Sequence, residues 1–182
     1  MRKLLNEELN RLSIDAFKEA EKLPVVIILD NVRSMNNVGS VFRTADAFRI
    51  QSIALCGITA VPPNKEIHKT ALGATDSVHW EYFDNTLEAV KYYKNMKYLI
   101  CAVEQVDQES SLEDFLIEDD KSYALVFGHE IHGVAQEIVD VCDVAIEIPQ
   151  YGTKHSLNIS VSAGITLWEF YKKLAKEHIL SQ

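Results

Sequence analysis

The sequence predicts an α/β fold, with a mainly parallel sheet that helices flank on both faces. Short apolar runs rich in Val and Ile alternate along the chain with stretches of helical spacing, which is typical of strands joined by crossover helices. The chain has 182 residues, of which 47% are hydrophobic, and this is enough to bury one sizeable core. We therefore expect one main domain.

The first expected element is an amphipathic helix that ends at Pro24. Apolar side chains recur there at helix-like intervals, at Leu4, Leu5, Leu9, Leu12 and Phe17. We expect residues 1–24 to form an N-terminal helical extension and residues 25–182 to form the main domain.

The expected strands and helices then alternate. The β-rich runs are Val25–Leu29, Ser52–Cys56, Tyr98–Val103, Ser122–Phe127 and Val144–Ile148. Helical spacing covers Val38–Phe48, Lys65–Leu72, Thr86–Met96, Val134–Val141 and Leu157–Lys176. Asn36 or Asn37 is expected to cap the first of these helices, and Ser156, taken alone, would also suit as a cap of the last.

The net charge of −9 is unevenly distributed. Eight acids without a base lie between residues 104 and 120, namely Glu104, Asp107, Glu109, Glu113, Asp114, Glu118, Asp119 and Asp120. The rest of the chain is nearly balanced. Segment Asn31–Arg49 carries Arg33, Arg43 and Arg49 against Asp46 alone, so it is a candidate to face a phosphate.

Several classes of protein are disfavoured. The apolar runs are too short to span a bilayer, and the charged N-terminus lacks a signal-type apolar core, so we expect a cytoplasmic protein without membrane contact. Cys56, Cys101 and Cys142 stand singly among apolar residues, which favours reduced, buried thiols. The seven glycines form no G-x-G pair, and no P-loop motif is present, so a glycine-rich phosphate cradle is disfavoured.

Three segments carry polar groups next to expected strand ends, where ligands of parallel sheets gather. The first holds Asn37 and Arg43, which taken alone also fit a helix cap and a surface ion pair. The second runs from Gly128 to Gly133, and its histidines are at i and i+3 instead of the i and i+4 of helical zinc motifs, so we expect no metal. The third leads into the last helix, where short polar side chains suggest a ligand or a tight backbone contact.

In order and spacing, these segments resemble the three signature motifs of the SpoU (TrmH) branch of the SPOUT RNA methyltransferases. The motifs are N-x-x-x-x-x-R at Asn37–Arg43, G-x-E-x-x-G at Gly128–Gly133 and I-P-x-x-G-x-x-x-S-L-N-x-S at Ile148–Ser160. Lys69–Ala74 also resembles a family segment, so the resemblance extends from Val25 into the C-terminal helix. In one departure, Arg49 stands where the family commonly has glycine, and in another, no long RNA-binding domain precedes residue 25.

The resemblance implies a fold, partners and a cofactor. The fold is the SPOUT α/β-knot, in which the C-terminal part is threaded as a trefoil knot, and residues 25–182 become the methyltransferase domain. The expected assembly is a homodimer with active sites near the subunit interface. The cofactor is S-adenosylmethionine, with its binding residues implied at Gly128, Ile148, Leu157, Val103 and Pro149.

The implied reaction is methyl transfer to a ribose 2′-hydroxyl of tRNA or rRNA. Its implied catalytic residues are Arg43, Asn37, Glu130, Ser156 and Asn158, and Arg33, Arg49 and Lys154 are the expected RNA contacts. Because the pKa of arginine is too high for a base, we expect Arg43 to stabilise the developing alkoxide and to orient a phosphate, with Asn37 and Glu130 positioning it.

Two alternatives stay open at this stage. One is a non-catalytic RNA-binding module with the same fold, although the joint presence of the five catalytic residues speaks against it. The other is a small-molecule methyltransferase, which the overall acidity fits better. Salt-dependent RNA binding distinguishes them, because phosphate contacts make affinity fall as salt rises.

Overall fold

The computed structural model describes residues 1–108 and 110–178, so Glu109 of the acidic segment lies outside the described residues. The described residues form a seven-stranded sheet in the order β3-β2-β1-β6-β4-β7-β5, with parallel pairing throughout. The strands are β1 (Leu23–Asp30), β2 (Ile50–Cys56), β3 (His79–Phe83), β4 (Leu99–Val103), β5 (Ser110–Ser111), β6 (Tyr123–Phe127) and β7 (Val144–Glu147). The helices are η1 (Asn6–Leu9), α1 (Ile14–Glu19), α2 (Met35–Ala47), α3 (Lys65–Ala71), α4 (Ala74–Ser77), α5 (Thr86–Asn95), α6 (Gln136–Val139) and α7 (Ile159–His178).

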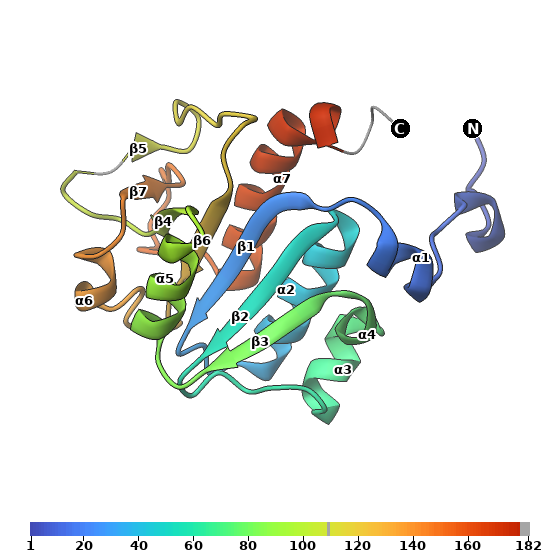
Figure 1. Cartoon of the computed structure of the whole chain (residues 1–182), viewed down its shortest axis with the longest axis horizontal. Helices are drawn as coiled ribbons and strands as arrows, with labels where there is room; N and C mark the ends of the chain where they lie inside the picture. The colour runs from blue at the N-terminus through green and yellow to red at the C-terminus, as the bar shows by residue number, and fades with distance from the viewer. Residues whose placement is uncertain (109, 179–182) are drawn as a thin grey trace.

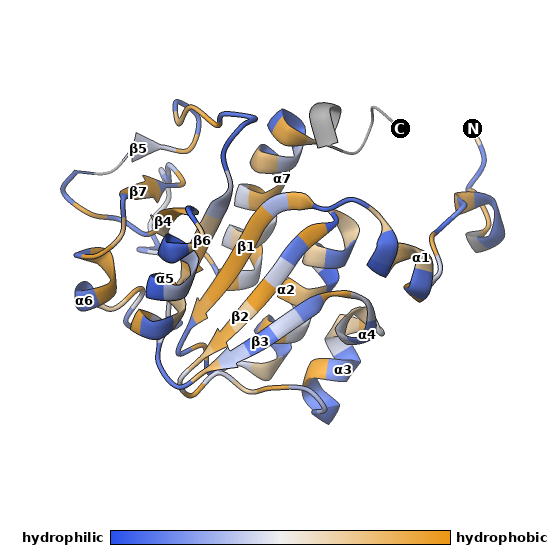
Figure 2. Cartoon of the chain, in the orientation of Figure 1, coloured by the Kyte–Doolittle hydropathy of each residue, from blue (hydrophilic) through white to orange (hydrophobic). Residues whose placement is uncertain are grey.

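Helices cover both faces of the sheet, as β1 illustrates. Val25, Ile27 and Leu29 belong to the core that includes α2 and α7, whereas Val26 and Ile28 belong to the core that includes α5 and α6. Since both faces are buried, β1 is hydrophobic along almost its whole length (Figure 2). The predicted α/β fold with a parallel sheet is confirmed.

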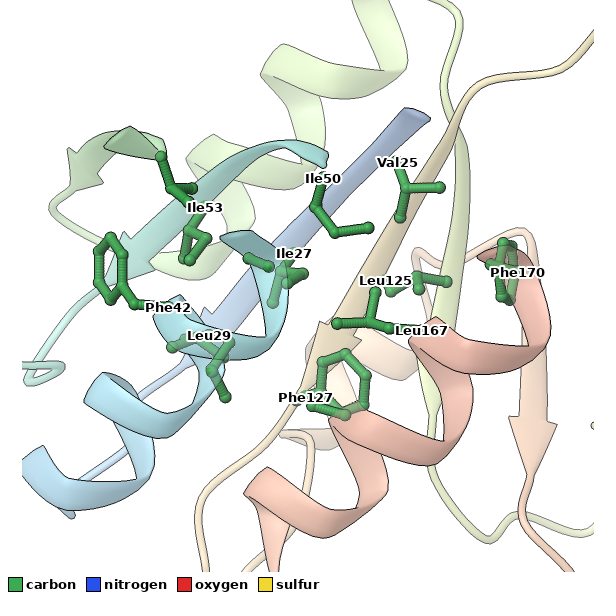
Figure 3. Packing of buried hydrophobic residues seen from close by; sticks show 14 of the residues in the cluster. Val25, Ile27, Leu29, Phe42, Ile50, Ile53, Leu125, Phe127, Leu167 and Phe170 are labelled. Atoms are coloured by element: carbon green, nitrogen blue, oxygen red, sulfur yellow. The ribbon is translucent and has the colours of Figure 1, made fainter. Parts of the chain in front are cut away.

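The larger core lies between the sheet and the two helices α2 and α7. Figure 3 shows Phe42 of α2 and Leu167 of α7 against side chains of β1 and β6, among them Leu29 and Phe127. The α2 helix is held in turn by α3, because Gly39 lies against Thr70 and the Ile67 carbonyl, where a Cβ would overlap both. These contacts fix α2, which carries the first motif.

The expected interior strands and the longer helices are present with small shifts at their ends. The edge strands β3 and β5 were not predicted, because edge strands bury only part of their surface and lack a continuous apolar run. The four-residue helix α4 was not predicted either. The helix predicted at Val134–Val141 is shorter in the structure, where it is α6 at Gln136–Val139. Its first part is instead held by carboxylates, since the Val134 and Ala135 N–H groups donate to Glu104 and Asp30 at 2.9 and 3.0 Å.

The prediction of one amphipathic helix up to Pro24 is wrong. The segment forms η1 and α1 and projects from the side of the sheet (Figure 1), and Pro24 lies inside β1. Phe17 packs into the core, but Leu4 and Leu5 are exposed. The helix ends where Ala20 takes an extended conformation, before the chain enters the sheet through the 2.9 Å hydrogen bond from Leu23 N to Arg49 O.

The predicted cap of α2 is wrong, and Ser156 does not cap α7. Ser34 caps α2 by accepting a 3.3 Å hydrogen bond from Asn37 N, so Asn37 lies in the first turn and its side chain serves another contact. The last helix begins at Ile159, beyond Ser156, and Asn158 accepts from Ser160 N at 2.9 Å.

The three cysteines are free thiols, and Cys56 and Cys101 are buried whereas Cys142 is partly buried. Burial raises the pKa of Cys56 to about 12. In the part of the chain that the structure describes, no helix combines the length and apolar character needed to cross a membrane.

Candidate functional site

A cavity of about 300 Å³ lies at the carboxyl ends of three neighbouring strands, β6, β4 and β7. The loops that follow these strands enclose it. Its apolar lining consists of Val103, Phe127, Ile131, Ile146, Ile148, Leu157 and Ile159. Its polar lining includes Glu104, Gln105, His129, Glu130, His132, Glu147, Gln150, His155, Ser156 and Ser162. This edge of a parallel sheet is where ligands usually bind.

The loop after β6 is closed tightly between its two glycines. A Cβ at Gly128 would overlap the backbone of Gly133 and Val134, so only glycine permits this approach. His129 N donates to Gly133 O at 2.9 Å and Gly133 N donates to His129 O at 2.8 Å, with Gly133 at a φ of 66°. The G-x-E-x-x-G spacing therefore forms a compact loop that presents Glu130.

Glu130 ties this loop to the start of α2. Its carboxylate accepts hydrogen bonds from Ser34 N at 2.8 Å, from Arg33 N at 3.0 Å and from Asn37 Nδ2 at 3.1 Å. Burial tends to raise the pKa of Glu130, but hydrogen bonds from its own backbone N–H, from Ser34 and Arg33 and from Asn37 outweigh burial and hold the pKa below its ordinary value of 4.5. The carboxylate is therefore ionised at neutral pH.

The third motif joins through Asn158. Asn158 Nδ2 donates to Asn37 Oδ1 at 3.2 Å, and Asn158 Oδ1 accepts from Ser160 N and Ser160 Oγ at 2.9 and 2.6 Å. These contacts fix the orientation of both carboxamides. Three segments far apart in the sequence thus meet in one hydrogen-bonded chain, Glu130–Asn37–Asn158.

Most of the expected cofactor residues lie together. Gly128, Ile148, Leu157 and Val103 line the cavity, whereas Pro149 is not among its lining residues. Of the expected catalytic residues, Glu130 and Ser156 also line it.

Sequence reasoning missed Glu104, which it treated only as part of the acidic segment. Glu104 lines the cavity and accepts from Val134 N and Gln105 N, both at 2.9 Å. Its position directly after a buried strand was the available signal.

Arg43 does not line this cavity. It is exposed, and it lines a second cavity, of about 450 Å³, together with Arg49 and Arg11. Among the described residues, Asn37 and Glu130 form no hydrogen bond to Arg43, so one chain does not bring them together as expected.

The other expected RNA contacts are at the surface. Arg33 is exposed and Arg49 is partly buried, while Lys154 is exposed in the loop that leads to α7. Arg33 also lines a shallow hollow beside Glu130 and His129.

The histidines of the second motif do not form a metal site with other ligands. The rings of His129 and His132 are 4.9 Å apart, but His129 Nδ1 accepts the Ile131 N–H at 3.0 Å. Within residues 1–108 and 110–178, no group of three or more His, Cys, Asp or Glu side chains is arranged to hold a metal ion.

Comparisons with known proteins agree with these motifs. Residues 24–168 match the SpoU rRNA Methylase family. The 23S rRNA (guanosine-2′-O-)-methyltransferase RlmB of Nitrosomonas europaea is 31% identical over 149 residues, which are 82% of this chain and 56% of that protein. A Staphylococcus haemolyticus protein whose name assigns it provisionally to the TrmH family of tRNA/rRNA methyltransferases is 31% identical over 160 residues. This chain spans 63% of that protein's length.

Solved structures share the fold. The TrmH/SpoU tRNA modifying enzyme of A. aeolicus superposes with a TM-score of 0.78 at 27% identity, over 90% of this chain and 81% of that one. An AdoMet-bound rRNA methyltransferase from Sinorhizobium meliloti gives a TM-score of 0.76 at 26% identity, over 90% and 62% of the two chains. With the three motifs joined at one sheet edge, the chain belongs to the SpoU rRNA methylase family.

Proposed function

We propose that the chain transfers a methyl group from S-adenosylmethionine to a ribose 2′-hydroxyl of tRNA or rRNA. The observation that carries the proposal is the Glu130–Asn37–Asn158 hydrogen-bonded chain beside a cavity lined by the second and third motifs. The name of the relative RlmB specifies 2′-O-methylation of guanosine, and the S. meliloti neighbour was solved with AdoMet. Both support the choice of reaction and cofactor.

The cavity fits the proposed cofactor. Val103, Ile148 and Leu157 offer an apolar wall for a planar base, and Gly128 leaves the loop backbone accessible because it has no Cβ. This cofactor has no phosphate, so the missing glycine-rich cradle is no obstacle. When bound, S-adenosylmethionine supplies an electrophilic methyl group on a positively charged sulfur.

The residues around the cavity would position the acceptor. The ionised Glu130 holds the Asn37 carboxamide, and Asn37 and Asn158 together present fixed donors and acceptors to a ribose. Ser156 adds a hydroxyl at the cavity wall. Arg43 would stabilise the developing alkoxide and orient a substrate phosphate, since its guanidinium stays charged and binds phosphate through two N–H groups.

We further propose a homodimer that forms through α7. Along α7, Val161, Ile165 and Trp168 recur every three or four residues and remain between 39% and 49% exposed. Such a stripe is unfavourable in water, and a second copy of the same stripe would cover it. A monomeric mass in light scattering across working concentrations would contradict this, and Ile165→Lys is expected to shift the mass from dimer to monomer.

A C-terminal trefoil knot is part of the same proposal. The edge pair β7 and β5 lies on the far side of β4, whereas α7 packs against α2 and β1. The segment after β7 must therefore return across the ends of β4 and β6, where threading through the loop after β6 would occur. An experimental chain trace in which residues 149–158 pass outside that loop would exclude the knot.

The decisive test of the proposed function is to map 2′-O-methyl groups in RNA from cells with and without this protein. We expect at least one ribose site to lose its methyl group when the protein is absent. An unchanged methylation map would remove the main support for the activity. RNA affinity that falls steeply with salt would favour an RNA substrate over a small molecule, with Arg33, Arg49 and Lys154 as proposed contacts.

A further inference from the structure

We propose that the N-terminal segment and the end of α2 form a binding site for an RNA phosphodiester, in which Arg11 and Arg49 add cationic groups beside Arg43, whose phosphate contact is already part of the proposed function. The inference rests on the proposed function, because it assigns the bound anion to the substrate RNA. It gives residues 1–24 a role in holding the substrate.

The site is the cavity of about 450 Å³ that lies apart from the predicted cofactor site. Three parts of the chain enclose it: residues 9–14 with Phe17, the second half of α2 with Arg49, and the turn around Gly73 that leads into α4. Phe17 is 6% exposed and packs with the turn's neighbour Ala74 in the main core, which anchors the segment that carries Arg11.

The charges around the cavity are unbalanced. Among the described residues, none of the three guanidinium groups forms an ion pair with a carboxylate. Asp46 also lines the cavity and its Oδ2 accepts a 2.5 Å hydrogen bond from Ser77 Oγ, so three arginines face one carboxylate among the described residues of the lining. In a chain of net charge −9, this local excess of positive charge, with no ion pair to the three arginines among the described residues, favours the binding of an external anion.

A fourth cation lies close to the cluster. The pKa of Lys22 is lowered, first by burial and then by the positive charge of Arg49, while the nearby Glu19 acts in the opposite direction. Lys22 Nζ donates to the carbonyl groups of Phe17 and Ala20, and these hydrogen bonds stabilise the C-terminal end of α1. A further cation therefore lies near Arg49, outside the cavity.

The position along α2 favours a substrate phosphate. Asn37 lies in the first turn of the helix and Arg43 follows six residues later, which is about 9 Å along the axis. The same rigid helix thus carries both the Asn37 contact and the arginine cluster. The guanidinium fork matches the two free oxygens of a phosphodiester, and single-stranded RNA presents such groups at every nucleotide.

The role of Arg49 can be tested by a substitution that leaves the backbone turn unchanged. It ends α2 in the left-handed conformation, with a φ of 49°, where glycine is the residue best tolerated. Arg49→Gly therefore removes the charge without disturbing the turn. Lys97 has the same conformation, with a φ of 69°, after α5 and is not among the cavity residues, so Lys97→Gly is the matched control.

The experiment measures binding of a fluorescent single-stranded RNA oligonucleotide by anisotropy over a salt series, for the full chain and for Arg11→Ala, Arg49→Gly and Lys97→Gly. Each lost phosphate contact should lower the slope of log affinity against log salt by about 0.7, which corresponds to roughly fivefold weaker binding at 0.1 M salt. We expect this for the two arginine variants, and wild-type values for Lys97→Gly. Thermal unfolding checks that each variant is folded.

Two outcomes overturn the site. In the first, all three variants keep the wild-type slope. In the second, the arginine variants change the oligomer mass and leave RNA affinity unaltered, which would make the cavity an interface between copies of the chain.

Failure of the proposed function is measured separately, by calorimetry with S-adenosylhomocysteine and by 2′-O-methyl mapping. If wild-type protein binds this probe and methylates RNA while the slopes are unchanged, only the phosphate site is wrong. If the slopes fall as expected but no probe binding or methylation is found, the RNA site stands and the activity is wrong.

Discussion

Glu130 connects two loops that lie far apart in the sequence, so its charge should affect stability as well as activity. Because the pKa of Glu130 is lowered, its contribution to the free energy of unfolding is present above its ordinary value of 4.5 and is lost as pH falls through the lower, folded-state pKa. Wild-type protein should therefore lose stability as pH falls below about 4.5, and Glu130→Gln should lose less over the same window.

Urea unfolding at a series of pH values measures this difference. Glu130 is only partly buried, so solvent screening limits the expected difference to about 1 kcal/mol or less. Glu113→Gln, at an exposed position in the acidic segment, is the control and should follow the wild-type curve. Parallel curves for wild type and Glu130→Gln would show that the amide contacts of this carboxylate contribute nothing.

Arg43 is predicted to be needed for methyl transfer but not for cofactor binding. Arg43→Ala should abolish turnover, because the alkoxide and the substrate phosphate lose their cationic partner, while calorimetry with S-adenosylhomocysteine should give the wild-type affinity, since Arg43 does not line the cofactor cavity. Lys91→Ala on the exposed side of α5 serves as the control. Near-normal turnover of Arg43→Ala would refute the assigned role.

For individual residues, the sequence predicted which side chains belong to the site better than it predicted how they contact one another. Motif spacing identified Glu130, Asn37 and Asn158, and these three do form one hydrogen-bonded chain. The place of Arg43 could not be predicted, since spacing along a helix gives the face of a residue but not what covers that face. The role of Glu104 depends on a loop that closes only in three dimensions.

Among the elements, the loop after β6 depends most strictly on glycine. Gly128→Ala places a Cβ against the backbone of Gly133 and Val134, so the loop must open or the strand end must move. We expect a loss of about 1–3 kcal/mol in the free energy of unfolding and a marked loss of cofactor affinity. Gly152→Ala is the matched control, because no atom lies within 4 Å of its added Cβ. Equal stability of the two variants in thermal unfolding would contradict the tight closure of this loop.

Interior and peripheral elements differed in how well the sequence predicted them. Strands such as β1 and β6 are buried on both faces, so their sequences are continuous apolar runs that can be recognised. The N-terminal leucines have helical spacing too, but Leu4 and Leu5 remain exposed, and periodicity does not reveal whether a partner surface exists. Edge strand β5 has two residues, too few for any pattern.

Across the whole molecule, acidity and RNA binding are compatible because the charges are segregated. Eight acids of the 104–120 segment account for most of the excess, while the arginines of α2 and the N-terminal segment gather around one cavity. A polyanion responds to the local potential more than to the net charge. The net charge alone would have favoured a small-molecule substrate, and the placement of the arginines favours RNA.

The separation of Arg43 from Glu130 within one chain leads to a prediction about the proposed dimer. If a second copy supplies Arg43 to the site that contains Glu130, then Arg43→Ala and Glu130→Ala remove different halves of each active site. In a mixed dimer of the two inactive variants, one of the two sites then has both residues intact. Random exchange of subunits yields mixed dimers as half of the population, so the mixture should recover roughly a quarter of wild-type methyl transfer.

Methylation assays on the separate and mixed variants measure this recovery, after unfolding and refolding them together to exchange subunits. The control mixes Glu130→Ala with Asn158→Ala, because Asn158 and Glu130 belong to the same hydrogen-bonded chain and no intact site can form. No recovery with the Arg43 variant, in mixtures shown to contain mixed dimers, would mean that Arg43 acts on the site of its own chain. Since Arg43 is exposed and Glu130 lines another cavity, α2 or the loop after β6 would then have to move when RNA binds.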